Sequence, residues 1–275
     1  MAGEDSPMTG TYSFDNVTLL ITHYNRSASL ERLLRAFREL NCGFGDIVVS
    51  DDGSKPVHIQ TIQALRHTYP FRLVTTPVNK GLGNNINKGQ DAVTTPYTLY
   101  VQEDFVPTAI FPAHFRDALD MMKQEKDIDV IRFYAYFPYP YKKPYKKGYS
   151  EIFFHKAPWY GNHLKFYFYS DHPHLRRSNF FDKFGRYAEG QSGDQTEYRM
   201  SLSFIHHKAR GLVFDAFTTL FHQVNSADEP STMNRSDWKQ SPNVLVRFAR
   251  YLYLKAKFAR WTLDVLTGKY VRKQP

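Results

Sequence analysis

The chain has 275 residues, 42% of them hydrophobic, which is enough to bury the core of one large domain or of a domain with a small appendage. Its single cysteine, Cys42, excludes an internal disulfide and is typical of a reducing compartment. Residues 1–8 are unlike a signal peptide, and no apolar run approaches the roughly 18 residues of a membrane-spanning helix. We therefore expect a cytoplasmic protein that is soluble or touches the inner face of the plasma membrane from one side.

The net charge of +9 is concentrated near the end of the chain. Residues 244–275 contain eight Lys or Arg and one acid, Asp264, so this segment carries +7 and the first 243 residues only +2. A protein that binds nucleic acid usually carries its positive charge on the folded domain. We therefore expect no nucleic-acid partner, and the basic tail needs a separate explanation.

Short apolar runs alternate with helical patterns in the first half of the chain. Residues 17–22 have the length and composition of a buried strand, and Ser27 or Ser29 is expected to cap the helix that follows. That helix carries four apolar residues on one face, namely Leu30, Leu33, Leu34 and Phe37. Further elements are expected in the order strand, strand, helix, strand at 46–50, 71–75, 85–93 and 97–102.

This alternation of strands and helices predicts an α/β fold, with a mostly parallel sheet and helices on both faces. Parallel strands are covered on both faces, which explains why these runs are continuously apolar. Ligands of such folds bind at the carboxyl ends of the strands. The residues that directly follow each strand are therefore the candidates for a functional site.

The pattern is less regular in the second half of the chain. A helix is expected at 111–123 and a strand at 130–134, whereas the stretch at 137–149 is rich in proline and lysine and is expected to be a loop. Residues 159–190 are dense in aromatic side chains and show little periodicity. One helix, or two, is predicted for 243–266.

Polar residues follow three of the expected strands. They form the segments Thr22-His23-Tyr24-Asn25-Arg26, Asp51-Asp52-Gly53-Ser54 and Gln102-Glu103-Asp104. Acids at neighbouring strand ends repel one another unless a cation or a donor group joins them, and a divalent metal with a diphosphate would do so. The alternative is an ordinary turn at 51–54 and a solvated strand end at 102–104.

Four segments, in this order and spacing, resemble the nucleotide-binding half of glycosyltransferase family 2. They read VTLLITHYNR, IVVSDDGS, NKGLGNNINKGQDAV and YTLYVQEDF. The resemblance covers roughly residues 16–108 and continues weakly at 193–199 and around His222. Members of the family have the GT-A fold and are inverting enzymes with nucleotide-sugar donors. The resemblance therefore implies that fold, here with a C-terminal basic amphipathic helix as an appendage.

For the donor, the resemblance implies roles residue by residue. Asp51 matches the acid that accepts a hydrogen bond from uracil or a related base, and Asp52 shapes the same turn. Lys80 is expected to meet a phosphate, while Gly81 and Gly83 would let the backbone approach the ligand. The segment after the first strand, which is expected to hold the nucleotide, contributes Thr22, Tyr24, Asn25 and Arg26.

For the metal, residues 102–104 fall where the family has its Asp-x-Asp motif. This implies that Asp104 binds the Mn²⁺ or Mg²⁺ ion that bridges the two phosphates, with Glu103 helping or aimed at the donor sugar. Gln102 departs from the motif, because a neutral amide is a weaker ligand for a hard cation. His222 is a further candidate for a metal or phosphate contact, although a lone histidine is usually not a ligand.

An inverting transfer also needs a base that takes the proton from the acceptor hydroxyl. The family has its base at a helix start after the irregular region, and residues 190–197 match that position. The resemblance implies Asp194 as the base, with Glu197 as the second choice. An acid at a helix start with a Glu three residues later is also a capping pattern, and capping and catalysis are compatible.

The acceptor is expected to be a saccharide or a lipid-linked saccharide. Trp159, Tyr160 and Trp238 are candidates to stack on its rings, with core or interface packing as the equal alternative. The chain then divides into a flexible N-terminus, a nucleotide-sugar binding half, an acceptor-binding and catalytic half, and a basic helical tail, at 1–14, 15–108, 109–242 and 243–275.

Two interpretations of the tail stay open. Its apolar and basic residues fall mainly on different sides of a helix, although Lys255 interrupts the apolar stripe. The helix either packs on the catalytic domain with a solvated basic face or lies in the plane of an anionic membrane surface. The second interpretation would bring the active site to a lipid-linked acceptor, as in polysaccharide biosynthesis.

The leading hypothesis is a metal-dependent, hexosyltransferase-like glycosyltransferase with a nucleotide diphosphate sugar as donor, expected to be a UDP-sugar. A nucleotidylyltransferase also uses a parallel sheet and acids, but it needs an early Gly-rich basic loop, and 15–29 contains none. A non-catalytic nucleotide-sugar binding protein is favoured by Gln102 alone.

Overall fold

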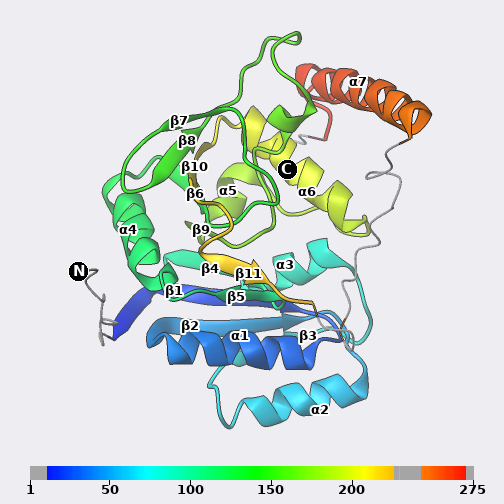
Figure 1. Ribbon diagram of the computed structural model, residues 1–275. Helices are drawn as coiled ribbons and strands as arrows, with labels where there is room; N and C mark the ends of the chain where they lie inside the picture. The colour runs from blue at the N-terminus through cyan, green and yellow to red at the C-terminus, as the bar shows by residue number, and fades with distance from the viewer. Residues whose placement is uncertain (1–10, 226–228, 230–242, 271–275) are drawn as a thin grey trace.

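A computed structural model describes residues 11–225, 229 and 243–270. A nine-stranded sheet lies at its centre (Figure 1). Its strands are β1 (Tyr12–His23), β2 (Cys42–Asp51), β3 (Arg72–Thr75), β4 (Tyr97–Gln102), β6 (Ile128–Arg132), β7 (Lys142–Pro144), β8 (Tyr149–Ile152), β9 (His174–Arg177) and β10 (Arg210–Phe214). A separate pair joins β5 (Phe105–Pro107) to β11 (Phe221–Gln223).

The strands of the large sheet follow the order β3-β2-β1-β4-β9-β6-β10-β8-β7. All of them run in one direction except β8 and β9, which are antiparallel to their neighbours. The expected mostly parallel α/β sheet is therefore confirmed. The strand order reverses at β1, since β2 and β3 lie on one side of it and β4 on the other. In open α/β sheets, ligands bind at such a reversal, beyond the carboxyl ends of the strands.

Helices cover both faces of the sheet, as the alternating pattern predicts (Figure 1). They are α1 (Ser27–Glu39), α2 (Pro56–Leu65), α3 (Leu82–Asp91), α4 (Phe111–Gln124), α5 (Phe180–Phe184), α6 (Gly193–His206) and α7 (Val244–Leu266), with a 3₁₀ turn at η1 (His163–Phe166).

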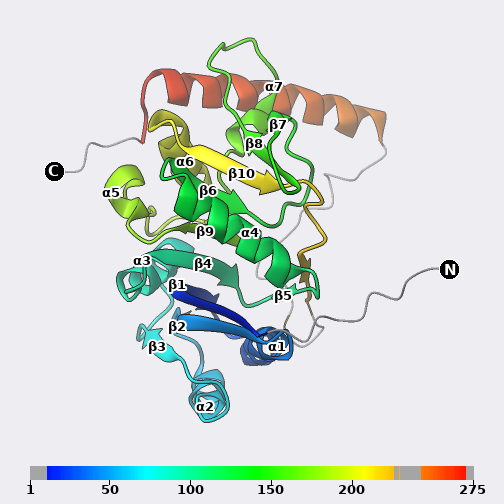
Figure 2. The same ribbon diagram turned by 90° about the vertical axis from the view of Figure 1, so that its left-hand side faces the viewer.

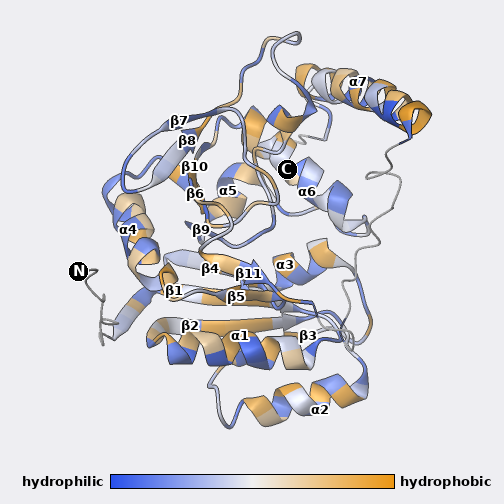
Figure 3. Ribbon diagram, viewed as in Figure 1, coloured by the Kyte–Doolittle hydropathy of each residue, from blue (hydrophilic) through white to orange (hydrophobic). Residues whose placement is uncertain are grey.

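Alternate side chains of β1 enter two separate hydrophobic clusters, because successive residues of a strand point to opposite faces. Leu19 and Ile21 pack with α1 and α4, whereas Leu20 packs with α3, α5 and α6. Figure 3 shows how hydrophobic and hydrophilic residues alternate around α1. The four apolar residues expected on one face of this helix are all buried in the first cluster.

Most of the expected elements are present, and the strand at 97–102 has the expected bounds. Helix α2 is an addition to the expected elements. The segment at 137–149, expected to be a loop, contains the short strand β7, which pairs with β8. A three-residue edge strand is compatible with its proline, because Pro144 lies at the edge of the sheet, where its missing N–H costs no ladder bond.

The expectation that Ser27 or Ser29 caps α1 is wrong. The cap position is Arg26, which makes no side-chain cap hydrogen bond. The backbone N–H groups of Ala28 and Ser29 instead donate to the Glu229 carboxylate, both at 2.9 Å. A carboxylate can accept from two N–H groups at once, and its charge suits the positive end of the helix dipole.

Helix α7 is a single helix that packs on the domain through its second half (Figure 2). The Trp261 ring stacks on Tyr198 with 4.3 Å between ring centroids, and the Tyr198 hydroxyl donates to Asp264 at 2.9 Å. The first half exposes six large apolar or aromatic side chains, which are Val244, Leu245, Phe248, Tyr251, Leu252 and Tyr253. Within the described part of the chain, no helix is both long enough and apolar enough to cross a membrane.

Candidate active site

A cavity of ≈ 1260 Å³ opens at the carboxyl ends of β1 and β4. The strand register pairs Thr22 with Gln102 and His23 with Asp51, so the three polar segments meet at one edge of the sheet. Ten of the residues proposed from the sequence line the cavity, namely Thr22, Tyr24, Arg26, Asp52, Gly81, Gln102, Glu103, Asp104, Asp194 and Glu197. The described lining does not include Asn25, Asp51, Lys80 or His222.

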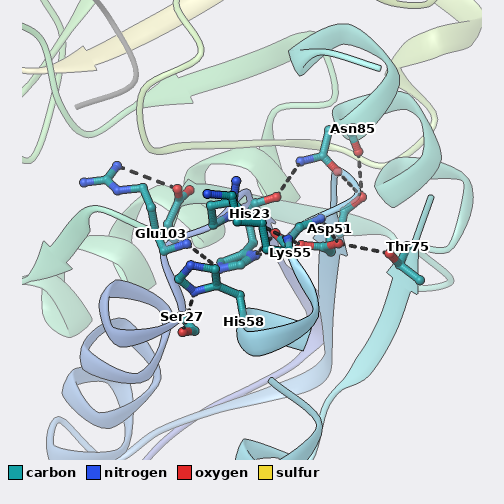
Figure 4. A network of polar contacts seen from close by, with 12 residues as sticks. His23, Ser27, Asp51, Lys55, His58, Thr75, Asn85 and Glu103 are labelled. Carbon is teal, nitrogen blue, oxygen red and sulfur yellow. Dashed lines mark hydrogen bonds and ion pairs between the residues drawn. The ribbon is translucent and has the colours of Figure 1, made fainter. Parts of the chain in front are cut away.

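Asp51 is fully buried and joins the ends of three strands (Figure 4). Its carboxylate accepts hydrogen bonds from His23 Nδ1 at 2.8 Å, from Thr75 Oγ1 at 2.9 Å, and from both the backbone N–H and the hydroxyl of Ser54. His23 Nε2 accepts the backbone N–H of Arg26 at 3.1 Å. This pattern describes a neutral histidine whose proton lies on Nδ1 and is donated to Asp51.

The hydrogen bonds keep the Asp51 carboxylate ionised. Burial raises the pKa of Asp51, but the hydrogen bonds from His23 and Ser54 outweigh burial and hold the pKa below its ordinary value. Because both oxygens already accept hydrogen bonds from the protein, Asp51 holds the strand ends together. Its implied contact with a nucleotide base stays a prediction.

Asp52 binds the loop that leads into α3. One oxygen accepts the Lys80 N–H and the other accepts the Gly81 N–H, both at 2.8 Å. Asn25 makes the equivalent connection between two other loops, since its backbone N–H donates to Ser54 and its Oδ1 accepts from Lys55 N–H, also at 2.8 Å. Three loops at the strand ends are thus joined by side chains from the polar segments.

The glycines of this edge have different functions. Gly53 has φ +68°, and a Cβ there would lie 2.4 Å from the Val78 carbonyl carbon, so only glycine fits. Gly81 lines the cavity and has φ +87°. A Cβ at Gly83 would lie 2.2 Å from the Ala188 carbonyl oxygen. Gly83 therefore allows α3 to pack closely on a distant segment, rather than allowing the backbone to approach a ligand.

Glu103 and Asp104 form a buried acid pair at the end of β4, beside the guanidinium of Arg26. Arg26 Nη1 lies 3.2 Å from Asp104 Oδ2 and 3.7 Å from Glu103 Oε1. Burial and the neighbouring Asp104 raise the pKa of Glu103 to about 8, so Glu103 keeps its proton at neutral pH. Asp104 therefore carries the negative charge of the pair that faces the cavity.

The donor set at Asp104 fits a hard divalent cation. Asp104 Oδ2 accepts from Gln223 Nε2 at 2.8 Å, whereas Oδ1 is buried without a hydrogen-bond partner. Within the described ranges, no group of three or more His, Cys, Asp or Glu forms a ready metal site. Mg²⁺ is commonly bound by one or two carboxylates together with substrate phosphates, which matches a single free carboxylate oxygen.

A second carboxyl pair lines the cavity, formed by Asp171 and Glu197. Burial raises the pKa of both, and their mutual hydrogen bond raises the pKa of Glu197 further while lowering that of Asp171. Glu197 therefore keeps the proton and donates it to Asp171. Gln102 Nε2 also donates to Asp171, at 3.2 Å. The amide at position 102 thus acts as a donor toward an acid, which a carboxylate in its place would repel.

Asp194 lies at the start of α6, exposed toward the cavity. The helix is capped by Ser192, whose side chain accepts from the Gln195 N–H at 3.4 Å. The expected capping role therefore belongs to Ser192, and the Asp194 carboxylate is not used for it.

His222 and Gln223 are adjacent on β11 and differ in surroundings. Gln223 lines the cavity and donates to Asp104, whereas His222 is exposed and does not belong to the described lining. Trp159 and Tyr160 are exposed and also lie outside that lining, and Trp238 is not among the described residues. The aromatic residues that do line the cavity include Tyr136, Tyr139, Tyr167, Tyr169 and Trp261.

The Asp51→Asn variant is expected to lose about 2 to 4 kcal/mol of unfolding free energy, because an amide cannot accept all the hydrogen bonds of the buried carboxylate. Since the folded-state pKa is lowered, this contribution is present above the unfolded pKa of about 4 and is lost as the pH falls further. Urea unfolding between pH 3 and 7 measures both effects. Asp182→Asn, at an exposed position, is the control. Equal stability of the two variants would contradict the conclusion that the Asp51 carboxylate holds the strand ends together.

Comparison with known proteins gives one family match. The family model described as "Glycosyl transferase family 2" matches residues 18–185, which is more than half of the chain. No curated protein matches significantly.

Among solved structures, S. aureus TarS 1-349 in complex with UDP-GlcNAc matches with a TM-score of 0.58 and 15% identity, over 81% of this chain and 62% of that chain. The same TarS fragment in complex with UDP gives a TM-score of 0.56 and 16% identity, over 77% and 61%. The chain therefore spans less than two thirds of the TarS fragment, and at these identities the likeness shows a shared fold. The matched region includes the strand ends that build the cavity, and the protein belongs to glycosyl transferase family 2.

Proposed function

We propose that this protein transfers a hexose from a UDP-sugar to a saccharide or lipid-linked saccharide, with inversion at the anomeric carbon and with the help of Mn²⁺ or Mg²⁺. The observation that carries the proposal is a single cavity lined by two separate acid groups, Glu103 with Asp104 at the end of β4 and Asp194 at the start of α6. The TarS complexes with UDP-GlcNAc and UDP support a nucleotide-sugar donor.

The donor would bind to the part of the cavity formed by residues 15–108. Asp52 holds the backbone of the loop at Gly81, and a glycine in this position leaves room for a phosphate beside the start of α3. Tyr24 and Arg26 also line the cavity. Lys80 does not line it, so a contact between Lys80 and a phosphate would require its side chain to turn inward.

Asp104 would hold the metal ion through its partner-free Oδ1. A bound divalent ion would neutralise the charge that develops on the departing diphosphate. Glu103, which keeps its proton at neutral pH, would donate a hydrogen bond to the donor sugar. His222 would need to move to reach this ion, because it does not line the cavity.

Asp194 would remove the proton from the acceptor hydroxyl. The oxygen of that hydroxyl attacks the anomeric carbon as the bond to the β-phosphate oxygen breaks, and UDP leaves with the electron pair of that bond. Glu197 is less suited to this role, because it already holds the proton that it donates to Asp171. The second carboxyl pair would therefore orient the substrates, with Asp194 as the base.

Hydrolysis of UDP-GlcNAc and related UDP-sugars, with and without Mn²⁺, tests the proposed reaction. Release of free sugar and UDP, stimulated by the metal, is expected. Formation of pyrophosphate from a nucleoside triphosphate would favour a nucleotidylyltransferase. Binding of UDP-sugar without any turnover, also in the presence of saccharide acceptors, would favour a non-catalytic binding protein.

The Asp104→Ala variant is expected to lose nearly all sugar transfer and most metal-dependent UDP-sugar binding, because the metal loses its carboxylate ligand. Isothermal titration of UDP-GlcNAc with and without Mn²⁺ measures the binding. Asp127→Ala removes an exposed carboxylate that is not part of the described cavity lining, and it is the control. Unchanged turnover in Asp104→Ala would contradict the metal assignment.

The Asp194→Asn variant is expected to bind UDP-sugar nearly as the unchanged protein does, while turnover falls by roughly 10²-fold or more. Steady-state rates at saturating donor, with circular dichroism to verify folding, provide the measurement. Glu197→Gln is the comparison, and it is expected to lower the rate less. A larger loss of turnover in Glu197→Gln than in Asp194→Asn would instead assign the role of base to Glu197.

A peripheral contact between α7 and an anionic membrane surface is part of this proposal. The exposed first half of α7 presents Leu245, Phe248 and Leu252 beside basic residues, which suits a helix lying at a membrane interface. Each basic residue near such a surface contributes on the order of 1 kcal/mol. This contact would bring the cavity close to a lipid-linked acceptor.

The chain is expected to sediment with vesicles that contain anionic lipid at low salt, and less so at high salt. The double variant Leu245→Ser/Phe248→Ser should lose sedimentation but keep its melting temperature, since both side chains are exposed. Trp261→Ala should instead lower the melting temperature, because this ring packs on Tyr198. Failure of the unchanged chain to bind vesicles at low salt would rule out the membrane contact.

A further inference from the structure

One face of α7 forms part of the wall of the cavity. Residues at spacings of three and four along a helix lie on the same side of it. Five residues of α7 with this spacing line the cavity, namely Arg250, Tyr253, Leu254, Lys257 and Trp261. Arg260 lines the cavity beside them. Helix α7 therefore brings three cations to the wall of the cavity that already contains the acids at the strand ends.

One of these cations, Lys257, contacts a tyrosine that lies near the proposed base. Lys257 Nζ donates to the Tyr167 hydroxyl at 3.0 Å and lies 4.1 Å from the centroid of the Trp261 ring. Burial, together with the nearby acids Glu197 and Asp194, raises the pKa of Tyr167 to about 12. The Tyr167 side chain thus contacts Lys257 and lies close enough to Asp194 for the charge of that carboxylate to affect it.

The main contacts of α7 are with other elements of the second half of the chain. The helix packs on η1 and α6, which belong to the second half of the chain (Figure 2). Its described acid, Asp264, already accepts from Tyr198 and lies 3.6 Å from Lys269 Nζ. This face therefore presents positive charge to the wall of the cavity on the side of η1 and α6, and the first turn of α6 carries Asp194.

We infer that the acceptor is anionic, and that Arg250, Lys257 and Arg260 bind a phosphate or carboxylate group of the acceptor while Asp194 activates one of its hydroxyl groups. Guanidinium and ammonium groups form strong, charge-assisted hydrogen bonds with both kinds of anion. A ring of the acceptor can pack on Tyr253, which also lines the cavity, beside the anionic group. This inference rests on the proposed function, since it assigns the substrate class of the same site.

The experiment measures binding of three probes to the protein saturated with UDP and Mn²⁺, so that the donor phosphate subsite is filled. The probes are glucose 6-phosphate, glucuronate and methyl glucoside, titrated at low salt by calorimetry or by NMR. At least one anionic probe is expected to bind roughly tenfold or more tightly than the neutral glucoside. Comparison of the two anions distinguishes a phosphate from a carboxylate as the preferred group.

Matched variants on the same helix locate the subsite. Arg260→Gln and Lys257→Gln are expected to weaken binding of the preferred anion by about fivefold to tenfold. Arg247→Gln and Lys255→Gln are the controls, because these exposed residues do not line the cavity, and they should leave binding unchanged. Since Lys257 packs on Trp261, the melting temperature is measured for each variant, and Arg260→Gln gives the result if Lys257→Gln is unstable.

Three outcomes would overturn the inference. They are equal binding of anionic and neutral probes, equal effects of the cavity and control variants, and anion binding that disappears once UDP is present. The last would assign the cations of α7 to the diphosphate of the donor. Failure of UDP itself to bind would contradict the proposed function instead, and the Arg260→Gln comparison without UDP would still test the anion subsite.

Discussion

The geometry of the site depends on the hydrogen bonds that the buried carboxylate of Asp51 accepts. This carboxylate accepts hydrogen bonds from His23 at the end of β1, from Ser54 after β2 and from Thr75 at the end of β3. The next residue, Asp52, holds the loop before α3 through two backbone N–H groups. A charged acceptor with several donors is stronger than neutral pairs. Two consecutive acids therefore fix the positions of the loops around the cavity.

The cavity concentrates acids that would repel one another if all were ionised. At the end of β4, the repulsion between Glu103 and Asp104 is reduced by Arg26 and by a proton on Glu103. On the other side, Asp171 and Glu197 share a proton. Asp104 belongs to the first pair and Asp194 to neither pair, and these are the two acids that we propose for the metal ion and for proton transfer. The two proposed functions would therefore use different parts of one cavity.

Helix α7 shows how one amphipathic helix can serve several surfaces. Its last turns pack on α6 through Trp261 and Asp264, one face of its middle turns lines the cavity, and its first turns expose apolar side chains. The imperfect separation of apolar and basic residues in the sequence follows from these three environments. A helix with only one buried face would carry a single continuous apolar stripe.

The sequence alone determined the α/β class of the sheet, the succession of its first strands along the chain, and the meeting of three polar segments at the strand ends. These features depend on local periodicity and on the rule that parallel strands end at the same edge. The positions of Thr22, Gln102 and Asp104 around the cavity follow from that rule, because each residue lies at or next to the end of a strand.

Only the tertiary structure decided which distant residues complete the site. Gln102 donates a hydrogen bond to Asp171, which lies 69 positions later in the sequence, and Gln223 donates to Asp104 over a separation of 119 positions. Glu229 caps α1 by accepting the N–H of Ser29, which lies 200 positions earlier in the chain. None of the three belongs to a motif with a spacing that predicts its partner. Such contacts arise when packing of the two halves brings buried polar groups together, because each buried donor or acceptor must then find a partner wherever the fold supplies one.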